Sequence, residues 1–187
     1  METYKDLFRF IRKPVYDQVE HPDLKTSLSL LAALLALSLL LSFSIAILLS
    51  VLENITELEL GEHAIDQLFE QYSPVFILLV VAVLAPVIEE LIFRGPLYLF
   101  RKSNYFAIIF YLSTFIFGFY HITNFELSPT VIYFAPLLVS PQLCIGFILG
   151  YIRVKLGLLW AILLHSLYNI VLVGPVILAR YLEIAIP

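Results

Sequence analysis

Apolar residues in this chain gather in long continuous runs instead of alternating with polar residues. The runs cover residues 28–52, 74–100, 106–122, 130–152 and 156–177. A helix needs about 20 consecutive, mostly apolar residues to cross the hydrocarbon core of a bilayer. The runs are near or above that length, so the pattern predicts five membrane helices.

Glycine and proline positions modify this expectation. Pro136 and Pro141 lie inside the fourth run, which we therefore expect to be kinked or broken. Gly146 and Gly150 follow in a G-x-x-x-G pair, which permits close approach of another helix. A Gly-Pro pair at 174–175 is expected to divide the last run from a C-terminal piece. The prediction is five or six transmembrane helices.

The segment before the first run has helical periodicity of its own. Its apolar stripe consists of Tyr4, Leu7, Phe8, Ile11 and Val15. The four basic residues of this segment fall off the stripe, as does Phe10, and Pro14 is expected to end the helix. This pattern favours a short amphipathic helix lying on the membrane surface. The alternative is a partner-facing or disordered N-terminus.

Composition supports the membrane assignment. The chain has 187 residues, of which 61% are hydrophobic and 14% charged, with a mean hydropathy of +0.95. These values exclude an ordinary soluble domain and predict an all-α polytopic membrane helix bundle. The single cysteine, Cys144, excludes an internal disulfide and a cysteine-based metal cluster. The expected surroundings are the lipid bilayer, with no nucleic-acid partner, and no oligomeric state is predicted.

The charged segments between the runs predict the orientation in the membrane. Basic residues precede the first run and recur at 101–102 and at Arg153 and Lys155, positions that share one side if there are five spans. Residues 53–72 carry acidic residues and no Lys or Arg. The positive-inside rule then places the N-terminus and both basic turns in the cytoplasm.

Three charged residues in the second run call for an explanation. An ionised residue at the centre of a membrane helix costs roughly 2.5–3.5 kcal/mol on insertion scales. Glu90 and Arg94 are four residues apart and can pair on one helix face. Glu89 is rotated by about 100° from Glu90 and has no such partner. Pro86, one turn earlier, removes a backbone donor and is expected to free a carbonyl and open space for water.

Two histidines in membrane runs add to this group. Glu89 and His121 lie equally far from Tyr105, 16 residues on either side, so a hairpin at that point places them at one level. His165 and Asn169 lie four residues apart and share a face of the last helix. We expect all these side chains to meet, with the last helix shifted relative to the hairpin.

Residue chemistry alone supports several functions for such a cluster. A carboxylate with imidazoles, shielded from lipid, can activate water, hold a metal or relay protons. The enzyme hypothesis therefore competes with a proton-coupled carrier and with a non-enzymatic scaffold or immunity protein. Purely structural contacts between helices would contribute roughly 0.6 kcal/mol each. The chain is short and has no recognisable inverted repeat, which argues against a carrier.

Three sequence blocks resemble the motifs of a known family. They are Glu89-Glu90-x-x-x-Arg94, Phe117-x-x-x-His121 and His165-x-x-x-Asn169. Their order and spacing are similar to those of the CAAX-protease and bacteriocin-processing family (CPBP, also called Abi). Its members are intramembrane endopeptidases and include the eukaryotic Ras-converting CAAX enzyme. The resemblance covers about residues 74–173.

The resemblance implies hydrolysis of a peptide bond in a membrane-associated protein or peptide. Glu89 would be the general base that activates water, and His121 would help to hold that water. His165 and Asn169 would stabilise the oxyanion. Glu90 and Arg94 would pair beside the catalytic group and fix the helix.

The resemblance leaves two mechanisms open. In the metallo type, Glu89, His121 and His165 would be the protein ligands of a catalytic zinc with water as the fourth. In the glutamate type no metal takes part. The predicted organisation is a cytoplasmic interfacial segment (1–27), a first transmembrane helix with an acidic loop (28–73), and a CAAX-protease-like catalytic core (74–187). A prenylated CAAX tail is one of several possible substrates.

Overall fold

The computed structural model describes residues 2–20, 22–56 and 71–182, and its regular elements in these ranges are helices. Five segments in this part of the chain are long and apolar enough to cross a membrane. They are Leu24–Ile55, Pro74–Tyr98, Phe106–Asn124, Pro129–Leu156 and Leu158–Tyr181. The protein is thus an integral, multi-pass, all-α membrane protein, as predicted.

The first span is one uninterrupted helix, α2 (Leu24–Thr56). It begins earlier than the predicted run because Asp23 caps it, accepting a hydrogen bond from the Thr26 backbone N–H at 3.0 Å. Hydrogen bonding with Thr26 lowers the pKa of the Asp23 carboxyl. Most of the predicted acidic loop at 53–72 lies outside the described residues, because the description stops at 56 and resumes at 71.

The second span is interrupted in its middle. It consists of α4 (Pro74–Leu79), a π-helical segment η1 (Val80–Leu84), α5 (Ala85–Phe93) and a short 3₁₀ turn η2 (Pro96–Tyr98). The third span, α6 (Phe106–Tyr120), ends in the 3₁₀ turn η3 (His121–Asn124). Glu89 therefore lies within a regular helix that directly follows an irregular one.

The fourth run is broken, as its prolines predicted. Helix α7 (Pro129–Leu138) and helix α8 (Ser140–Leu156) are separated by the single residue Val139. Gly157 connects α8 to the last helix with a φ of +104°, in the left-handed region that favours glycine.

The last helix, α9 (Leu158–Tyr181), runs straight through Pro175. The predicted division at the Gly-Pro pair is therefore wrong, and the described residues contain no sixth spanning helix. A proline removes only one intrahelical hydrogen bond. Abandoning the helix inside an apolar environment would leave many more backbone groups unpaired, so the helix continues.

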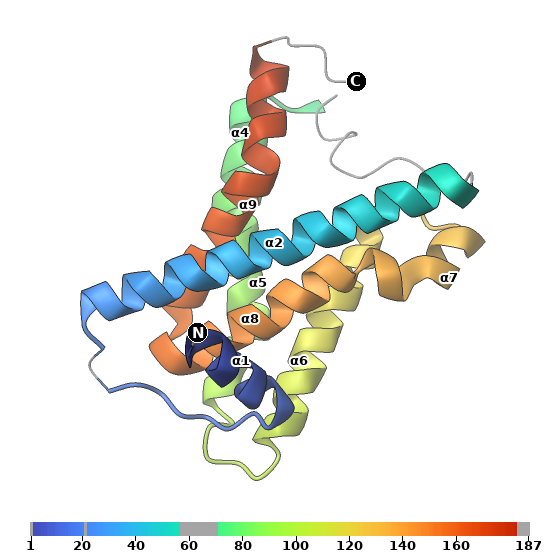
Figure 1. The fold of residues 1–187 in the computed structure, drawn as a ribbon. Coiled ribbons are helices and arrows are strands. Elements are labelled where there is room, and N and C mark those ends of the chain that lie inside the picture. Colours follow the sequence, from blue (N-terminus) through green and yellow to red (C-terminus); the bar gives the residue numbers. More distant parts are fainter. Residues whose placement is uncertain (1, 21, 57–70, 183–187) are drawn as a thin grey trace.

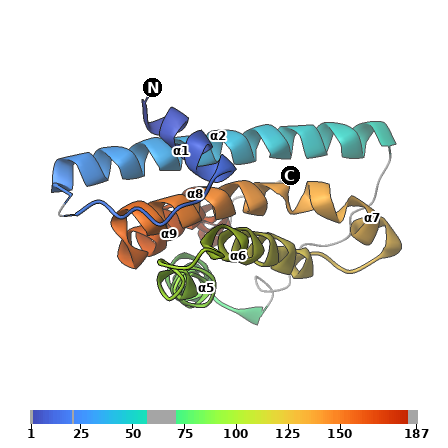
Figure 2. The ribbon, with the colours of Figure 1, turned by 90° about the horizontal axis from the view of Figure 1, so that it is seen from below.

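The helices pack in three layers (Figures 1 and 2). Figure 2 shows α2 covering one side, α8 and α9 in the middle, and α5 and α6 on the opposite side. Helix α8 contacts α6, α9 and α2, which makes it the central element of the bundle. Figure 1 shows α4 and α9 side by side. The second and last spans therefore pack against each other, through α4, η1 and α5 on one side and α9 on the other.

The N-terminal helix α1 (Glu2–Arg12) ends before Pro14, as predicted. Of its predicted apolar stripe Leu7 is buried, and Phe10, which lies outside the stripe, is buried as well. The reason is the packing of α1 against α8, because Phe10 lies three residues from Leu7 on the docking face. Tyr4, Phe8 and Val15 of the stripe are exposed. Contact of α1 with the membrane surface and a cytoplasmic N-terminus remain predictions.

Helices α6 and α8 approach each other closely because glycines line their contact. A Cβ atom at Gly150 would overlap the buried Phe110 ring of α6. At Gly146 it would lie 3.2 Å from atoms of Phe117 and Thr114. The predicted role of this glycine pair is confirmed, and the close approach brings the Gly146 carbonyl near the polar cluster.

This contact predicts different effects for two glycine substitutions. We expect Gly150→Ala to lower the free energy of unfolding in detergent micelles, because the new methyl group overlaps Phe110 and overpacking costs about 1–3 kcal/mol. In the matched control Gly174→Ala the nearest atom lies 3.9 Å away, so stability should not fall. Adding Phe110→Leu should restore the Gly150→Ala protein. Equal stability of the two alanine variants would contradict the packing argument.

Candidate active site

A buried ion pair occupies the middle of the helix bundle. Glu90 is 0% exposed and Arg94 1%, and Arg94 Nη1 lies 3.3 Å from Glu90 Oε1, which confirms the predicted pairing. Arg94 Nη2 also donates a hydrogen bond to the Gly146 carbonyl at 3.2 Å. The guanidinium carbon lies 3.8 Å from the centre of the Phe117 ring, a cation–π contact. Arg94 thereby joins α5 to both α8 and α6.

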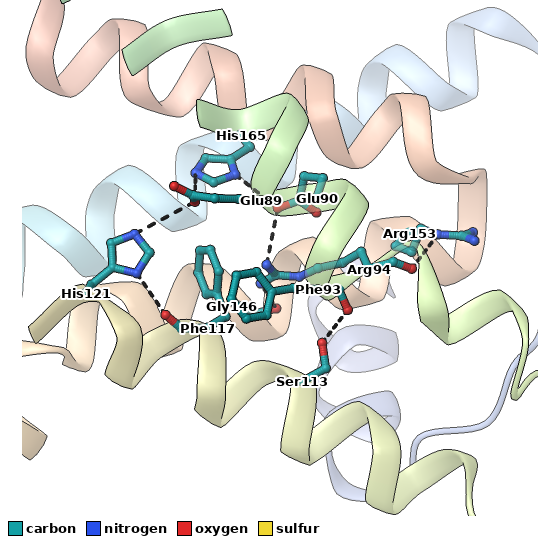
Figure 3. Close-up of polar contacts among 10 residues, drawn as sticks. All are labelled: Glu89, Glu90, Phe93, Arg94, Ser113, Phe117, His121, Gly146, Arg153 and His165. Carbon is teal, nitrogen blue, oxygen red and sulfur yellow. Dashed lines mark hydrogen bonds and ion pairs between the residues drawn. The ribbon is translucent and has the colours of Figure 1, made fainter. Parts of the chain in front are cut away.

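The same carboxylate also holds His165 of α9. His165 Nδ1 lies 3.0 Å from Glu90 Oε1 (Figure 3). An ionised carboxylate only accepts hydrogen bonds, so Nδ1 carries the proton in this contact. The other ring nitrogen, Nε2, then faces Glu89 at 3.7 Å from its Oε2. Glu90 therefore fixes the orientation of the His165 ring toward the neighbouring carboxylate.

His121 reaches Glu89 from the opposite side. Its Nδ1 lies 2.8 Å from the Phe117 carbonyl, which can only accept, so this nitrogen is the donor. Its Nε2 faces Glu89 Oε2 at 3.9 Å. Figure 3 shows both rings converging on Glu89. The prediction that Glu89 and His121 share a level is confirmed, and the two histidines meet at one carboxylate oxygen.

Glu89 Oε2 is a buried atom that has no hydrogen-bond donor within the described part of the chain. Both imidazole nitrogens lie beyond the 2.7–3.2 Å typical of a direct hydrogen bond. Glu89, His121 and His165 line a cavity of about 370 Å³, whose wall also includes Asn169 and Gln142. The arrangement can therefore accommodate water or part of a ligand between Glu89 and the histidines.

Asn169 occupies the cavity wall for a reason that the sequence only partly indicated. In the π-helical segment, the Ala85 N–H bonds to the Val80 carbonyl, one residue further back than in an α-helix. The corresponding donor for Val81 would be residue 86, which is a proline and has no N–H. Asn169 Nδ2 supplies the missing bond, at 2.8 Å from the Val81 carbonyl. The expectation that Pro86 leaves a backbone carbonyl free of its helical partner is met at Val81. The side-chain amide of Asn169 donates to this carbonyl.

Sequence reasoning missed two contacts that hold the end of α5. Ser113 of α6 donates to the Phe93 carbonyl, and Arg153 Nε of α8 donates to the Arg94 carbonyl at 3.1 Å. The last carbonyls of a helix have no intrahelical partner, and these side chains satisfy two of them. Both contacts are drawn in Figure 3. The active-site helix is thus fixed at both ends, by Asn169 before Glu89 and by these residues after it.

Comparison with known proteins gives the site a family. Residues 71–171, which include all three sequence blocks, match the family model for type II CAAX prenyl endopeptidases, Rce1-like. The chain belongs to this family. No curated protein and no solved structure gives a significant match. The resemblance read from the motifs is therefore confirmed at family level, and the Rce1-like family points to a CAAX-type protease.

The donor atoms at the site of this Rce1-like protein bear on metal binding. Glu89, His121 and His165 offer one carboxylate oxygen and two imidazole nitrogens, which is a chemically suitable set for zinc. Among residues 2–20, 22–56 and 71–182, however, no three His, Cys, Asp or Glu side chains form a group that could hold a metal ion. The donor types fit zinc, but in this structure the three side chains do not come close enough together to form a metal-binding group.

The ion pair predicts a large stability effect in the Rce1-like core. Arg94→Met should lower the free energy of unfolding by about 3–5 kcal/mol, because it leaves the Glu90 charge buried without its cation. The measurement is reversible unfolding in mixed micelles. Arg12→Met, at an exposed position on α1, is the matched control and should change stability by less than about 0.5 kcal/mol. A loss below about 1 kcal/mol for Arg94→Met would rule out this role.

Proposed function

We propose that the protein is an intramembrane endopeptidase in which Glu89 activates the water that attacks the peptide bond. The observation that carries the proposal is the buried, unpartnered Glu89 Oε2, faced by His121 Nε2 and His165 Nε2 across a cavity. A water molecule held among these atoms would satisfy the carboxylate and lie next to a general base. Membership in the Rce1-like family supports a protease.

The histidine contacts support separate roles for the two rings. His121 donates through Nδ1 to the Phe117 carbonyl, so its neutral form presents an acceptor at Nε2. A water that donates one proton to this nitrogen and the other to Glu89 has its oxygen lone pairs available for attack. This is the water-holding role that the resemblance implied for His121.

Oxyanion stabilisation is assigned to His165 and Asn169. Asn169 has two amide N–H groups, and the bond to Val81 occupies one of them. The second is available to the carbonyl oxygen of a substrate in the cavity. His165 can donate through Nε2 when both of its ring nitrogens carry protons, with Glu90 accepting at Nδ1. Removing one such donor typically costs about 2.7–4 kcal/mol of transition-state stabilisation.

The proposed reaction balances with the chain's own residues. The water oxygen forms a bond to the carbonyl carbon while Glu89 takes a proton from the water. The carbonyl oxygen becomes the oxyanion that His165 and Asn169 stabilise. When the C–N bond breaks, Glu89 returns the proton to the leaving nitrogen, and the products are a carboxylic acid and an amine. Glu90 and Arg94 do not touch the substrate in this scheme and keep the reacting groups in position.

Zinc remains a testable addition to this scheme. If bound, it would supply Lewis-acid polarisation of water and carbonyl oxygen, with Glu89, His121 and His165 as its ligands. The glutamate mechanism predicts full activity after dialysis against a strong chelator. Activity that is lost to the chelator and restored by added zinc would favour the metallo type.

The function is tested by comparing wild type with Glu89→Gln in lipid nanodiscs. Each is incubated with a pool of peptides from membrane proteins, and new peptide termini are identified by mass spectrometry. We expect termini with wild type, and a loss of about 10²–10⁴-fold in rate for Glu89→Gln, because the general base is removed with little change in shape. Asn169→Ala should lose about 10²–10³-fold.

Two outcomes would contradict the proposal. Equal cleavage by wild type and Glu89→Gln would remove Glu89 from the reaction. No cleavage by a well-folded wild type would favour a scaffold or immunity protein that binds peptides without cutting them. A proton-coupled carrier would instead keep its transport activity in the Asn169→Ala variant.

The π-helical segment generates a separate prediction. Pro86→Ala introduces an N–H that competes with Asn169 for the Val81 carbonyl. We expect about 10- to 100-fold lower turnover, because small displacements of catalytic groups are costly, while the protein stays folded. The matched control is Pro129→Ala at the first position of α7, where no backbone partner is needed. If Pro86→Ala has the same turnover as wild type, this positioning role is refuted.

A further inference from the structure

Gln142 provides a second unpartnered oxygen in the wall of the same cavity. Its side-chain Oε1 is buried and has no donor among the residues that the structure describes. The residue lines the cavity together with Glu89, His121 and His165, yet it belongs to none of the three motif blocks. Leaving a buried acceptor unpaired is costly, and a donor that enters the cavity from outside the chain would remove this cost.

The position of Gln142 follows from the α6–α8 contact. It lies in the first turn of α8, four residues before Gly146 and eight before Gly150, so the three share one helix face. Gly146 accepts the hydrogen bond from Arg94. Gln142 therefore lies one turn from the buried ion pair, toward the end of α6 where His121 is found. It lines the cavity from α8, alongside residues of α5, α6 and α9.

Several donors of neighbouring lining residues are engaged in contacts away from Gln142. Asn169 Nδ2 bonds to the Val81 carbonyl, and the Tyr168 hydroxyl lies 2.6 Å from Ser42 Oγ of α2. The ring N–H groups of His121 and His165 are directed to Phe117 and Glu90. Glu89 Oε2 and Gln142 Oε1 are thus two buried acceptors, both on residues that line the cavity, without a donor in the described part of the chain.

A peptide substrate brings a donor of the kind that Gln142 Oε1 lacks among the described residues. A protease must approach the peptide bond with the substrate backbone unwound, which releases N–H groups that were paired within a helix. In a site without bulk water each unpaired backbone group costs several kcal/mol. An acceptor close to the catalytic carboxylate offsets this cost, and an uncharged amide does so without repelling Glu89.

We propose that Gln142 is a substrate-binding residue whose side-chain oxygen accepts a hydrogen bond from a backbone N–H near the scissile bond. This inference rests on the proposed endopeptidase function and names one further contact of that site. The contact recognises the peptide backbone, so it contributes affinity for any extended peptide and no preference for particular side chains.

The test combines Gln142→Met with a series of modified substrates. Methionine keeps the length of the side chain and removes the amide. The substrate is a peptide that wild type cleaves in the terminus assay, prepared with each backbone N–H near the scissile bond replaced in turn by an ester oxygen. Binding is measured to Glu89→Gln proteins with and without Gln142→Met, and KM and kcat are measured in the active background. Cys144→Ala, on α8 but outside the cavity wall, is the control.

We expect Gln142→Met to weaken binding and raise KM by about 3- to 10-fold, the value of one hydrogen bond, with kcat changed less. One ester position should weaken binding to the Gln142 protein by a similar factor and have no further effect in Gln142→Met. Cys144→Ala should match wild type throughout.

Three results would overturn the inference. They are unchanged binding in Gln142→Met, an equal loss for every ester in both proteins, and no ester position that affects the Gln142 protein. The last of these does not depend on whether the variant folds. In each of these cases, cleavage that is seen with wild type and lost in Glu89→Gln would still support the proposed function. A wild type that cleaves nothing would reject both.

Discussion

The buried carboxylate of Glu90 is the constraint on which the active-site arrangement depends. Transferring such a charge from water into a helix bundle costs several kcal/mol, and that cost is offset only by well-placed partners. Glu90 has two, Arg94 from its own helix and His165 from α9. Arg94 then requires its own acceptors, and the Gly146 carbonyl of α8 is one of them. The Glu90 carboxylate therefore links α5 to α9 through His165 and, by way of Arg94, to α8.

The position of Glu89 is a consequence of this arrangement. Adjacent residues on a helix point about 100° apart, so once Glu90 faces Arg94 and His165, Glu89 has to point elsewhere. It points into the cavity, where His121 and His165 face it. The consecutive glutamates thus have different environments. Glu90 contacts Arg94 and His165 through Oε1, whereas Glu89 lines the cavity and has only the more distant histidine nitrogens near its Oε2. Each of them keeps one oxygen without a hydrogen-bond donor in the described part of the chain. Paired residues of the same type acquire different chemistry from their surroundings alone.

Those features that depend on helical periodicity and on run length could be predicted from the sequence. The five spans follow from hydrocarbon thickness, the Glu90–Arg94 pair from four-residue spacing, and the common level of Glu89 and His121 from their equal distance to the hairpin. The division at Pro175 was wrong because one lost hydrogen bond does not outweigh the cost of an unwound segment in lipid.

Contacts to backbone carbonyls could not be predicted in the same way. Asn169, Ser113 and Arg153 all bond to carbonyls that are free because a helix is irregular or ends there. Which carbonyl is free depends on the exact hydrogen-bond register, and a hydrophobic run does not encode that register. Gln142 was missed for another reason, because a single amide in an apolar run has no spacing partner that would mark it.

Departures from good local packing gather around the cavity, and this distribution is itself informative. The π-helical segment, the proline next to it and the unpartnered oxygens of Glu89 and Gln142 all lie at this cavity or directly beside it. Two atoms of the neighbouring ion pair, Glu90 Oε2 and Arg94 Nη1, are also buried without a hydrogen-bond partner in the described part of the chain. Further from the site, Ser38 shows a polar group satisfied locally, because it donates to the Leu34 carbonyl. Natural sequences break local rules mainly where function requires it and compensate in other places. The contacts of Asn169, Ser113 and Arg153 before and after Glu89 are such a compensation. They keep the Glu89 carboxylate in place although one of its oxygens has no hydrogen-bond donor among the described residues.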